Sequence, residues 1–185
     1  LSQSLLADID QAILALEQKI GKSFGDSSNP LLVSVRSGAK FSMPGMMETV
    51  LNVGMSKEVA ATLASKTGDS RFAWDSYRRF IEMFGKTVCE IPGDAFTKAA
   101  APIISAAGGT TMADLGGPEL QQVGDAFVDV VEKHTGTDFP FDARSQLIRA
   151  IEAVFHSWNS ERAQLYRRRE RISADLGTAV NVQAM

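Results

Sequence analysis

The chain has 185 residues, 44% of them hydrophobic and 22% charged, with a formal net charge of -3 and a single cysteine, Cys89. This length and apolar content suit one medium-sized domain and exclude a largely disordered chain, and no uninterrupted apolar stretch reaches the roughly 18 residues of a spanning helix. The acidic balance disfavours a general nucleic-acid binder, and the lone cysteine excludes an internal disulfide and favours a reducing cytoplasmic setting.

In the N-terminal part, helical periodicity comes first and a strand follows. Apolar residues spaced by three or four predict a helix over 5–20 that ends at Gly21, a common C-cap. Residues 31–35 read Leu-Leu-Val-Ser-Val and predict a short strand buried on both faces. Residues 36–45 have no apolar period and predict a loop, after which Thr49 is expected to open a helix.

Helices are expected over most of the chain after residue 49. Ser56 can cap a helix through about residue 66, and Ser70 can cap another. That second helix carries one apolar stripe, formed by Trp74, Tyr77, Ile81 and Phe84. The alanine-rich segment 95–107 is interrupted by Pro102 and is followed by paired glycines.

Three further helices and a second strand complete the prediction. Helical stripes cover 120–136 and the segment after Asp142, and Ser160 can cap a basic helix through about Ile172. Residues 179–182 predict a second strand. The expected fold is therefore α+β and predominantly helical. The aromatic residues expected in its core are Trp74, Phe80, Phe84, Phe155 and Trp158.

The strongest chemical candidate is Arg36, which follows the predicted strand and precedes a Gly/Ser/Met loop. An arginine fixed at a strand end suits an anion, because its guanidinium offers forked donors that match phosphate. Gly45 lets the backbone approach a ligand closely, and a helix opening at Thr49 would present its hydroxyl and N–H groups to that anion. By spacing alone, an ordinary loop with a salt-bridged Arg36 is the favoured alternative, since no standard phosphate-loop pattern is present.

Other polar features carry weaker signals. Arg78 and Arg79 lie off the aromatic stripe, either solvated or directed at a ligand. The arginines of 162–171 are interspersed with acids, which favours an ion-paired surface over a nucleic-acid contact. Two histidines, the single cysteine and several scattered carboxylates show no spacing typical of a metal site or of catalysis: His134, His156, Cys89, Glu48, Asp75 and Glu90.

Several specific sequence motifs show a family resemblance. The segments Leu-Leu-Val-Ser-Val-Arg-Ser-Gly-Ala at 31–39 and Ser-Met-Pro-Gly-Met-Met-Glu-Thr-Val-Leu-Asn at 42–52 closely resemble the ATP-binding domain of the pyruvate, phosphate dikinase family. Three further segments resemble it as well: 71–80, 153–168 and 177–185. The best matches lie in 31–90 and 140–185, whereas 91–139 matches loosely, as a variable helical subdomain.

The resemblance implies an ATP-grasp-like fold with a helical subdomain and a phosphotransferase activity. In that family the β-phosphoryl group of ATP passes to a histidine on a separate swivelling domain and then to pyruvate, giving phosphoenolpyruvate, AMP and pyrophosphate. It implies Mg²⁺ as the cofactor of ATP, a cytoplasmic location and a homodimeric full-length enzyme, with no nucleic-acid or membrane partner. Phosphoenolpyruvate synthase or another dikinase is the alternative within this class, and a non-catalytic helical interaction module is the alternative outside it.

The resemblance also implies site residues. Arg36 would be the catalytic, phosphate-binding arginine, and the loop from Gly45 to Thr49 would close over the phosphates. The full set of expected ATP contacts is Arg36, Gly45, Met46, Met47, Thr49, Arg79, Gln183 and Met185. The family's glycine-rich lysine segment and acidic metal ligands have no counterpart in this sequence. We therefore expect residues 1–185 to be a piece of the N-terminal ATP-binding domain that has no metal site and is inactive by itself.

Overall fold

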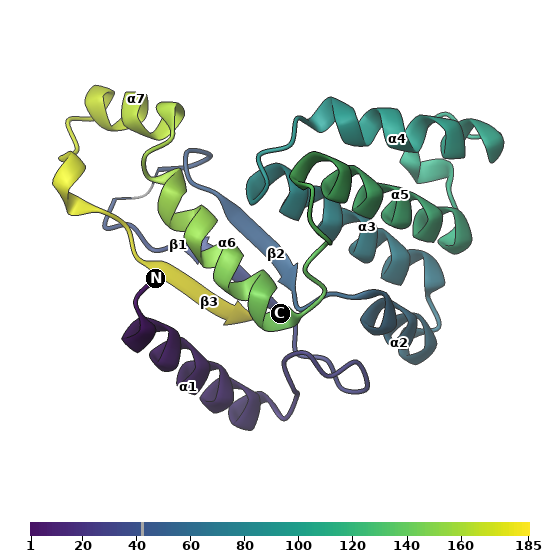
Figure 1. The fold of residues 1–185 in the computed structure, drawn as a ribbon, viewed down its shortest axis with the longest axis horizontal. Coiled ribbons are helices and arrows are strands. Elements are labelled where there is room, and N and C mark those ends of the chain that lie inside the picture. Colours follow the sequence, from purple (N-terminus) through teal and green to yellow (C-terminus); the bar gives the residue numbers. More distant parts are fainter. Residues whose placement is uncertain (42) are drawn as a thin grey trace.

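A computed structural model describes residues 1–41 and 43–185 (Figure 1); Ser42, a residue of the motif at 42–52, lies outside the described residues. The elements in chain order are α1 (Gln3–Ile20), β1 (Val33–Ser37), β2 (Thr49–Val53), α2 (Lys57–Thr67), α3 (Ser70–Thr87), α4 (Gly93–Ala106), α5 (Gly117–Thr135), α6 (Ala143–Ser157), α7 (Glu161–Arg169) and β3 (Val180–Ala184). Among these helices, none combines the length and the apolar character that crossing a bilayer requires.

The strands form an antiparallel sheet in the order β2–β1–β3, with β1 in the centre. Residues directly opposite one another in such a sheet point to the same face. Arg36 lies opposite both Thr49 and Asn181, and Ser34 lies opposite Gln183. These five residues define the polar face of the sheet. The other face is apolar and carries Val33, Val35, Val50, Val53, Val182 and Ala184.

Helix α6 crosses the apolar face of the sheet and leaves the polar face on the opposite side (Figure 1). Its Leu147, Ile151 and Val154 are buried in the same core cluster as the strand valines. Apolar residues recur every three or four positions in α6 and every two in β3, so each element has one face that is stabilised by leaving water. The burial of one sheet face orients Arg36 and its neighbours outward.

Helices α2 to α5 form a group beside β2 (Figure 1). Its centre is the contact between α3 and α5, where Tyr77 and Phe80 of α3 are buried. Phe139, in the connection to α6, contacts Phe80 and Phe84 with ring centroids 6.1 and 5.3 Å apart. This aromatic cluster therefore packs α3 against the segment that leads from α5 into α6.

The approach of α5 to α3 depends on Gly124. A Cβ at this position would lie 2.5 Å from the Cδ1 and Cε1 atoms of Tyr77, well inside van der Waals contact. The two helices can therefore approach this closely only because residue 124 has no side chain.

We expect Gly124→Ala to lower the free energy of unfolding by about 1–2 kcal/mol. Overpacking costs about 1–3 kcal/mol, and the better helix propensity of alanine offsets up to about 1 kcal/mol of that. Thermal unfolding of the 185-residue chain measures the change. Gly93→Ala is the matched control, since its added Cβ would meet only the flexible end of Lys86, at 3.4 Å. Equal melting temperatures for the two variants would contradict the close approach at Gly124.

A buried side chain also links α6 to the segment between β2 and α2. Gln146 is fully buried; its Oε1 accepts a hydrogen bond from the Gly54 N–H at 2.8 Å, and its Nε2 donates one to the Met55 carbonyl at 3.0 Å. Both backbone groups lie where β2 ends and the chain turns away from the sheet, with Gly54 at φ 100°. One amide therefore satisfies two backbone groups that lack a strand or helix partner.

The structure confirms the predominantly helical α+β fold and most of the predicted elements. The predicted C-cap at Gly21 and N-caps at Ser56 and Ser160 are present. Of the aromatic residues expected in the core, Phe155 is half-buried against the cluster and the others are buried.

Several boundaries and one element type differ from the prediction. The first strand spans Val33–Ser37 rather than 31–35, the last spans Val180–Ala184, and α7 ends at Arg169, before Ile172. Asp69, rather than Ser70, caps α3. The helix expected at Thr49 is wrong: Thr49–Val53 is strand β2, because its β-branched residues pair with β1.

Candidate functional site

Arg36 is the penultimate residue of β1 and lies on the polar face, exposed to solvent. It was predicted to follow a strand in a loop, whereas the structure places it within the strand itself. Among residues 1–41 and 43–185, no carboxylate lies within ion-pair distance of its guanidinium. The alternative of a salt-bridged Arg36 is therefore wrong for the described residues, and its donors face solvent.

A cavity of about 420 Å³ opens beside Arg36. Two cations line it, Arg36 and Lys40, and none of the described residues that line it is acidic. The loop between β1 and β2 and the start of β2 form the rest of its wall, through Ser37, Ala39, Phe41, Met43, Pro44, Gly45, Met47 and Thr49. Two positive charges without a carboxylate make this cavity suited to an anion with several oxygens.

Thr49 contributes to this cavity in a different way from that expected. As the first residue of β2, it lies directly opposite Arg36 on the polar face and lines the same cavity. Among the described residues around this cavity, no helix begins whose N-terminus could bind an anion. The hydroxyl of Thr49 and the guanidinium of Arg36 instead form adjacent donors on one rigid sheet.

The loop between β1 and β2 is attached at both ends to the C-terminal part of the chain. The Gly38 N–H donates to the Ala179 carbonyl at 2.7 Å, and the Glu48 N–H donates to Ser157 Oγ at 3.2 Å. The Glu48 carboxylate pairs with Arg162 of α7. These contacts hold the two ends of the loop against the sheet.

Gly45 lies at the exposed turn of this loop. Its φ is 72°, and a Cβ built on it would meet nothing within 4 Å. The left-handed backbone, rather than crowding, therefore accounts for glycine at this position. Met46 is half-buried beside it, and its N–H donates to the Met43 carbonyl at 3.0 Å.

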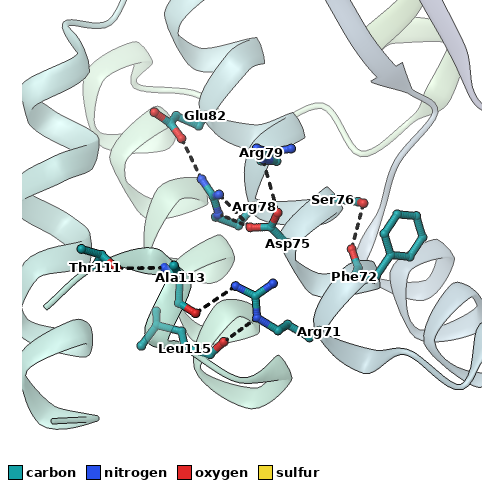
Figure 2. Close-up of polar contacts among 10 residues, drawn as sticks. All are labelled: Arg71, Phe72, Asp75, Ser76, Arg78, Arg79, Glu82, Thr111, Ala113 and Leu115. Carbon is teal, nitrogen blue, oxygen red and sulfur yellow. Dashed lines mark hydrogen bonds and ion pairs between the residues drawn. The ribbon is translucent and has the colours of Figure 1, made fainter. Parts of the chain in front are cut away.

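Arg79 lies at a second cavity, of about 540 Å³, between β2 and α3. Leu51 and Asn52 of β2 also line it. Strand β2 therefore contributes residues to both cavities, Thr49 to the first and these two to the second. Arg79 is 67% exposed in its side chain and pairs with Asp75 at 3.3 Å (Figure 2).

The two predicted residues at the C-terminus lie on and beside the polar face. Gln183 is exposed on that face, opposite Ser34. The Met185 Sδ accepts a hydrogen bond from the Asn52 N–H at 3.3 Å, next to the second cavity. Of the predicted residues, Arg36, Gly45, Met47 and Thr49 therefore line one cavity, and Met46 lies in the same loop. Arg79 lines the second cavity from α3, Met185 lies beside it, and Gln183 lies on β3.

Sequence reasoning missed three residues of this region: Lys40, Asn52 and Asn181. Asn181 could have been found from strand alternation, because it is two residues before Gln183 and shares its face. Asn52 is a non-glycine residue at φ 57°, beside an irregularity in the β1–β2 pairing, and no sequence signal marks it. Lys40 follows Arg36 by four residues in a loop whose path the sequence does not determine.

The weaker candidates have structural roles. Arg162 pairs with Glu48, and Arg167 is buried, stacks 4.1 Å from the centroid of Trp158 and donates to its carbonyl. The basic helix α7 is therefore partly internal, and only part of its charge is solvated. Burial raises the pKa of the Cys89 thiol, against a smaller opposing effect of Arg149, so this cysteine is not an activated nucleophile.

The described residues do not fit a resident metal ion. Within residues 1–41 and 43–185, no group of three or more His, Cys, Asp or Glu side chains is placed to hold one. The cavity at Arg36 presents cationic and hydroxyl donors, which suit the oxygens of an anion rather than a cation.

The fold and the two cavities along β2 define an α+β domain with an anion-suited sheet face. A family model described as "Pyruvate phosphate dikinase, AMP/ATP-binding domain" matches residues 1–185. Similar curated proteins include the pyruvate, phosphate dikinases of Giardia intestinalis, 46% identical over 99% of this chain, and of Clostridium symbiosum, 45% identical over 100% of it. That of Rickettsia conorii is 48% identical over 97%. The chain belongs to the pyruvate phosphate dikinase AMP/ATP-binding domain family, and it spans about a fifth of the length of these relatives.

Proposed function

We propose that the polar face and its two cavities bind ATP, and that the full-length protein is a pyruvate, phosphate dikinase. It would convert ATP, phosphate and pyruvate into phosphoenolpyruvate, AMP and pyrophosphate through a phosphohistidine on another domain. The observation that carries this proposal is the cavity at Arg36, lined by two cations and no described carboxylate, in a chain of this family. A triphosphate is the polyanion that such a cavity suits.

Each site residue has a proposed role. Arg36 and Thr49 would contact phosphate oxygens, and the backbone of Gly45, Met46 and Met47 would close over them. Arg79 would contact the phosphate chain from the second cavity. Gln183 and Met185 would contact the adenine along β3.

Arg36 would also act in the transfer step. The charge on a transferring phosphoryl group spreads over its equatorial oxygens, and a cation fixed beside them stabilises that charge as it redistributes. A position near the end of β1 suits this role, because β1 is paired on both sides and holds the backbone of Arg36 rigid. Mg²⁺ would supply further charge neutralisation as the partner of ATP, and we assign no ligand for it to this chain.

The wider setting is part of the same proposal. The swivelling phosphohistidine domain of the full-length chain would bring its acceptor to the bound triphosphate. The full-length enzyme would be a cytoplasmic homodimer, as the family resemblance implies.

We expect Mg²⁺–ATP to stabilise the full-length protein against thermal unfolding. A ligand that binds only the folded state contributes about 2.7 kcal/mol when its free concentration is one hundred times Kd. A titration of ATP into the full-length protein, followed by its melting temperature, measures the effect. The same titration of the 185-residue chain should show much weaker binding, since few contacts would offset the lost freedom of ATP.

Inorganic phosphate at equal ionic strength is the control for general salt effects. A full-length protein whose melting temperature does not respond to ATP would contradict the proposal and would favour a non-catalytic interaction module. Sub-micromolar ATP affinity of the 185-residue chain would instead show that these residues contain the complete site.

A further inference from the structure

One surface of α3 carries a row of alternating charges, of which Asp75, Arg78, Arg79 and Glu82 are drawn in Figure 2. Three of these four, Arg78, Arg79 and Glu82, also line the second cavity. Asp75 Oδ1 accepts from Arg78, at 2.9 Å from Nε and 2.7 Å from Nη2. Asp75 Oδ2 lies 3.3 Å from Arg79 Nε. Glu82 continues the row, 3.1 Å from Arg78 Nη1 and 3.1 Å from Lys86 Nζ.

Burial divides this row into a fixed part and a solvated end. The side chains of Arg78 and Asp75 are only 11% and 21% exposed, whereas that of Arg79 is 67% exposed. Arg78 is held by two carboxylates from within the same helix, at i−3 and i+4. Asp75 is therefore fixed by a buried partner, and Arg79 is the member of the row that would otherwise be free to change rotamer.

The atoms used in the Asp75–Arg79 pair determine what Arg79 can offer. Its Nε lies 3.3 Å from Asp75 Oδ2, within ion-pair distance, and no side-chain hydrogen bond of Arg79 is found in the described part of the chain. The two terminal nitrogens, which form the outer edge of the guanidinium fork, remain available for a phosphate. Holding Nε also reduces the rotamer entropy that a long side chain loses on binding.

The acids in the row do not cancel its positive charge. Arg78, Arg79 and Lys86 contribute three positive charges, while Asp75 and Glu82 contribute two negative ones. Each carboxylate contacts two cations, so the row keeps one excess positive charge at the cavity wall. A carboxylate can therefore orient Arg79 here without making the cavity repel an anion.

We propose that Asp75 is a positioning residue that presents the guanidinium of Arg79 to the phosphate chain of the nucleotide, with Arg78 as the buried anchor. This inference rests on the proposed function. It adds Asp75, which contacts no ligand itself, to the residues that determine how tightly the phosphates are held. In the sequence alone, Asp75 is one of several scattered carboxylates without a recognisable spacing.

The test is a double-mutant cycle in the full-length enzyme, with kcat and KM for ATP measured under saturating phosphate and pyruvate. Asp75→Asn keeps the size of the side chain and removes its charge. We expect it to raise KM for ATP about five- to tenfold, within the coupling expected of contacting residues. In an Arg79→Ala background, the same substitution should change KM less than about twofold, because the residue through which Asp75 acts is gone.

Two further variants separate positioning from folding. Asp75→Glu restores the charge and should recover most of the ATP affinity, even where Asp75→Asn lowers the melting temperature. Asp94→Asn removes an equivalent intrahelical ion pair on α4, where Lys98 lies 2.7 Å away, and should leave KM unchanged.

The outcomes distinguish this inference from the proposed function. Equal effects of Asp75→Asn with and without Arg79 would overturn the positioning role. So would an Arg79→Ala enzyme with unchanged KM for ATP, although ATP binding itself would then still stand. A full-length protein that does not bind ATP would overturn both.

Discussion

Arg36→Ala in the full-length enzyme is expected to lower kcat by about a hundred- to a thousandfold, the cost typical of removing one preorganised donor at a reacting centre. Arg36 is exposed, its strand β1 is paired on both sides, and its guanidinium contacts no described carboxylate. Its removal should therefore change the free energy of unfolding by less than about 0.5 kcal/mol. Steady-state kinetics and thermal melting of the same preparation measure the two effects.

Two variants test the specificity of that result. Arg36→Lys keeps the charge but loses the forked donors, and we expect it to recover only part of the lost kcat. Arg168→Ala removes an exposed arginine on α7 and should leave kcat unchanged. Wild-type kcat in Arg36→Ala, or a collapse of its melting temperature, would contradict the assigned role.

Gln146→Ala is expected to lower the free energy of unfolding by about 2–4 kcal/mol. It leaves the Gly54 N–H and the Met55 carbonyl without partners in a fully buried site, and each unsatisfied group costs about 1–3 kcal/mol. For a domain of this size the loss corresponds to roughly 5–15 °C in melting temperature. Thermal unfolding of the 185-residue chain measures it.

Gln122→Ala is the matched control, because it makes the same chemical change on the exposed surface of α5. We expect that variant to unfold within about 0.5 kcal/mol of the wild type. If the two variants melted at the same temperature, the bridge from α6 to the end of β2 would contribute nothing to stability.

The sequence predicted the helices well because their evidence is local. Gly21, Ser56 and Ser160 cap helices where expected, and the stripe from Trp74 to Phe84 is buried. The strand at Thr49 was missed because Thr-Val-Leu-Asn-Val does not alternate between polar and apolar residues, and its pairing with β1 determines its conformation.

The candidate site was predictable only in part. The sequence motif around Arg36 identified the family and hence the loop, whereas charge and spacing alone favoured an ordinary ion pair. Arg36 lies opposite Asn181 because of the register between two strands that are 145 residues apart in the sequence, and no local pattern encodes that register. Asp75 was dismissed for the same reason, since the consequence of its contact with Arg79 depends on the cavity beside it.

The pairing of β1 with β2 and with the distant β3 also determines at what stage of folding the polar face can form. Arg36 meets Thr49 across the loop that joins β1 to β2, but it meets Asn181 only when the chain, having passed through the helices, returns to β1. Closing so long a loop is entropically costly, and non-local pairings of this kind slow folding. A chain truncated before residue 180 would keep Arg36 opposite Thr49 yet leave the other edge of β1 unpaired. The polar face is thus completed by chain closure, and a growing polypeptide acquires it only when β3 emerges from the ribosome.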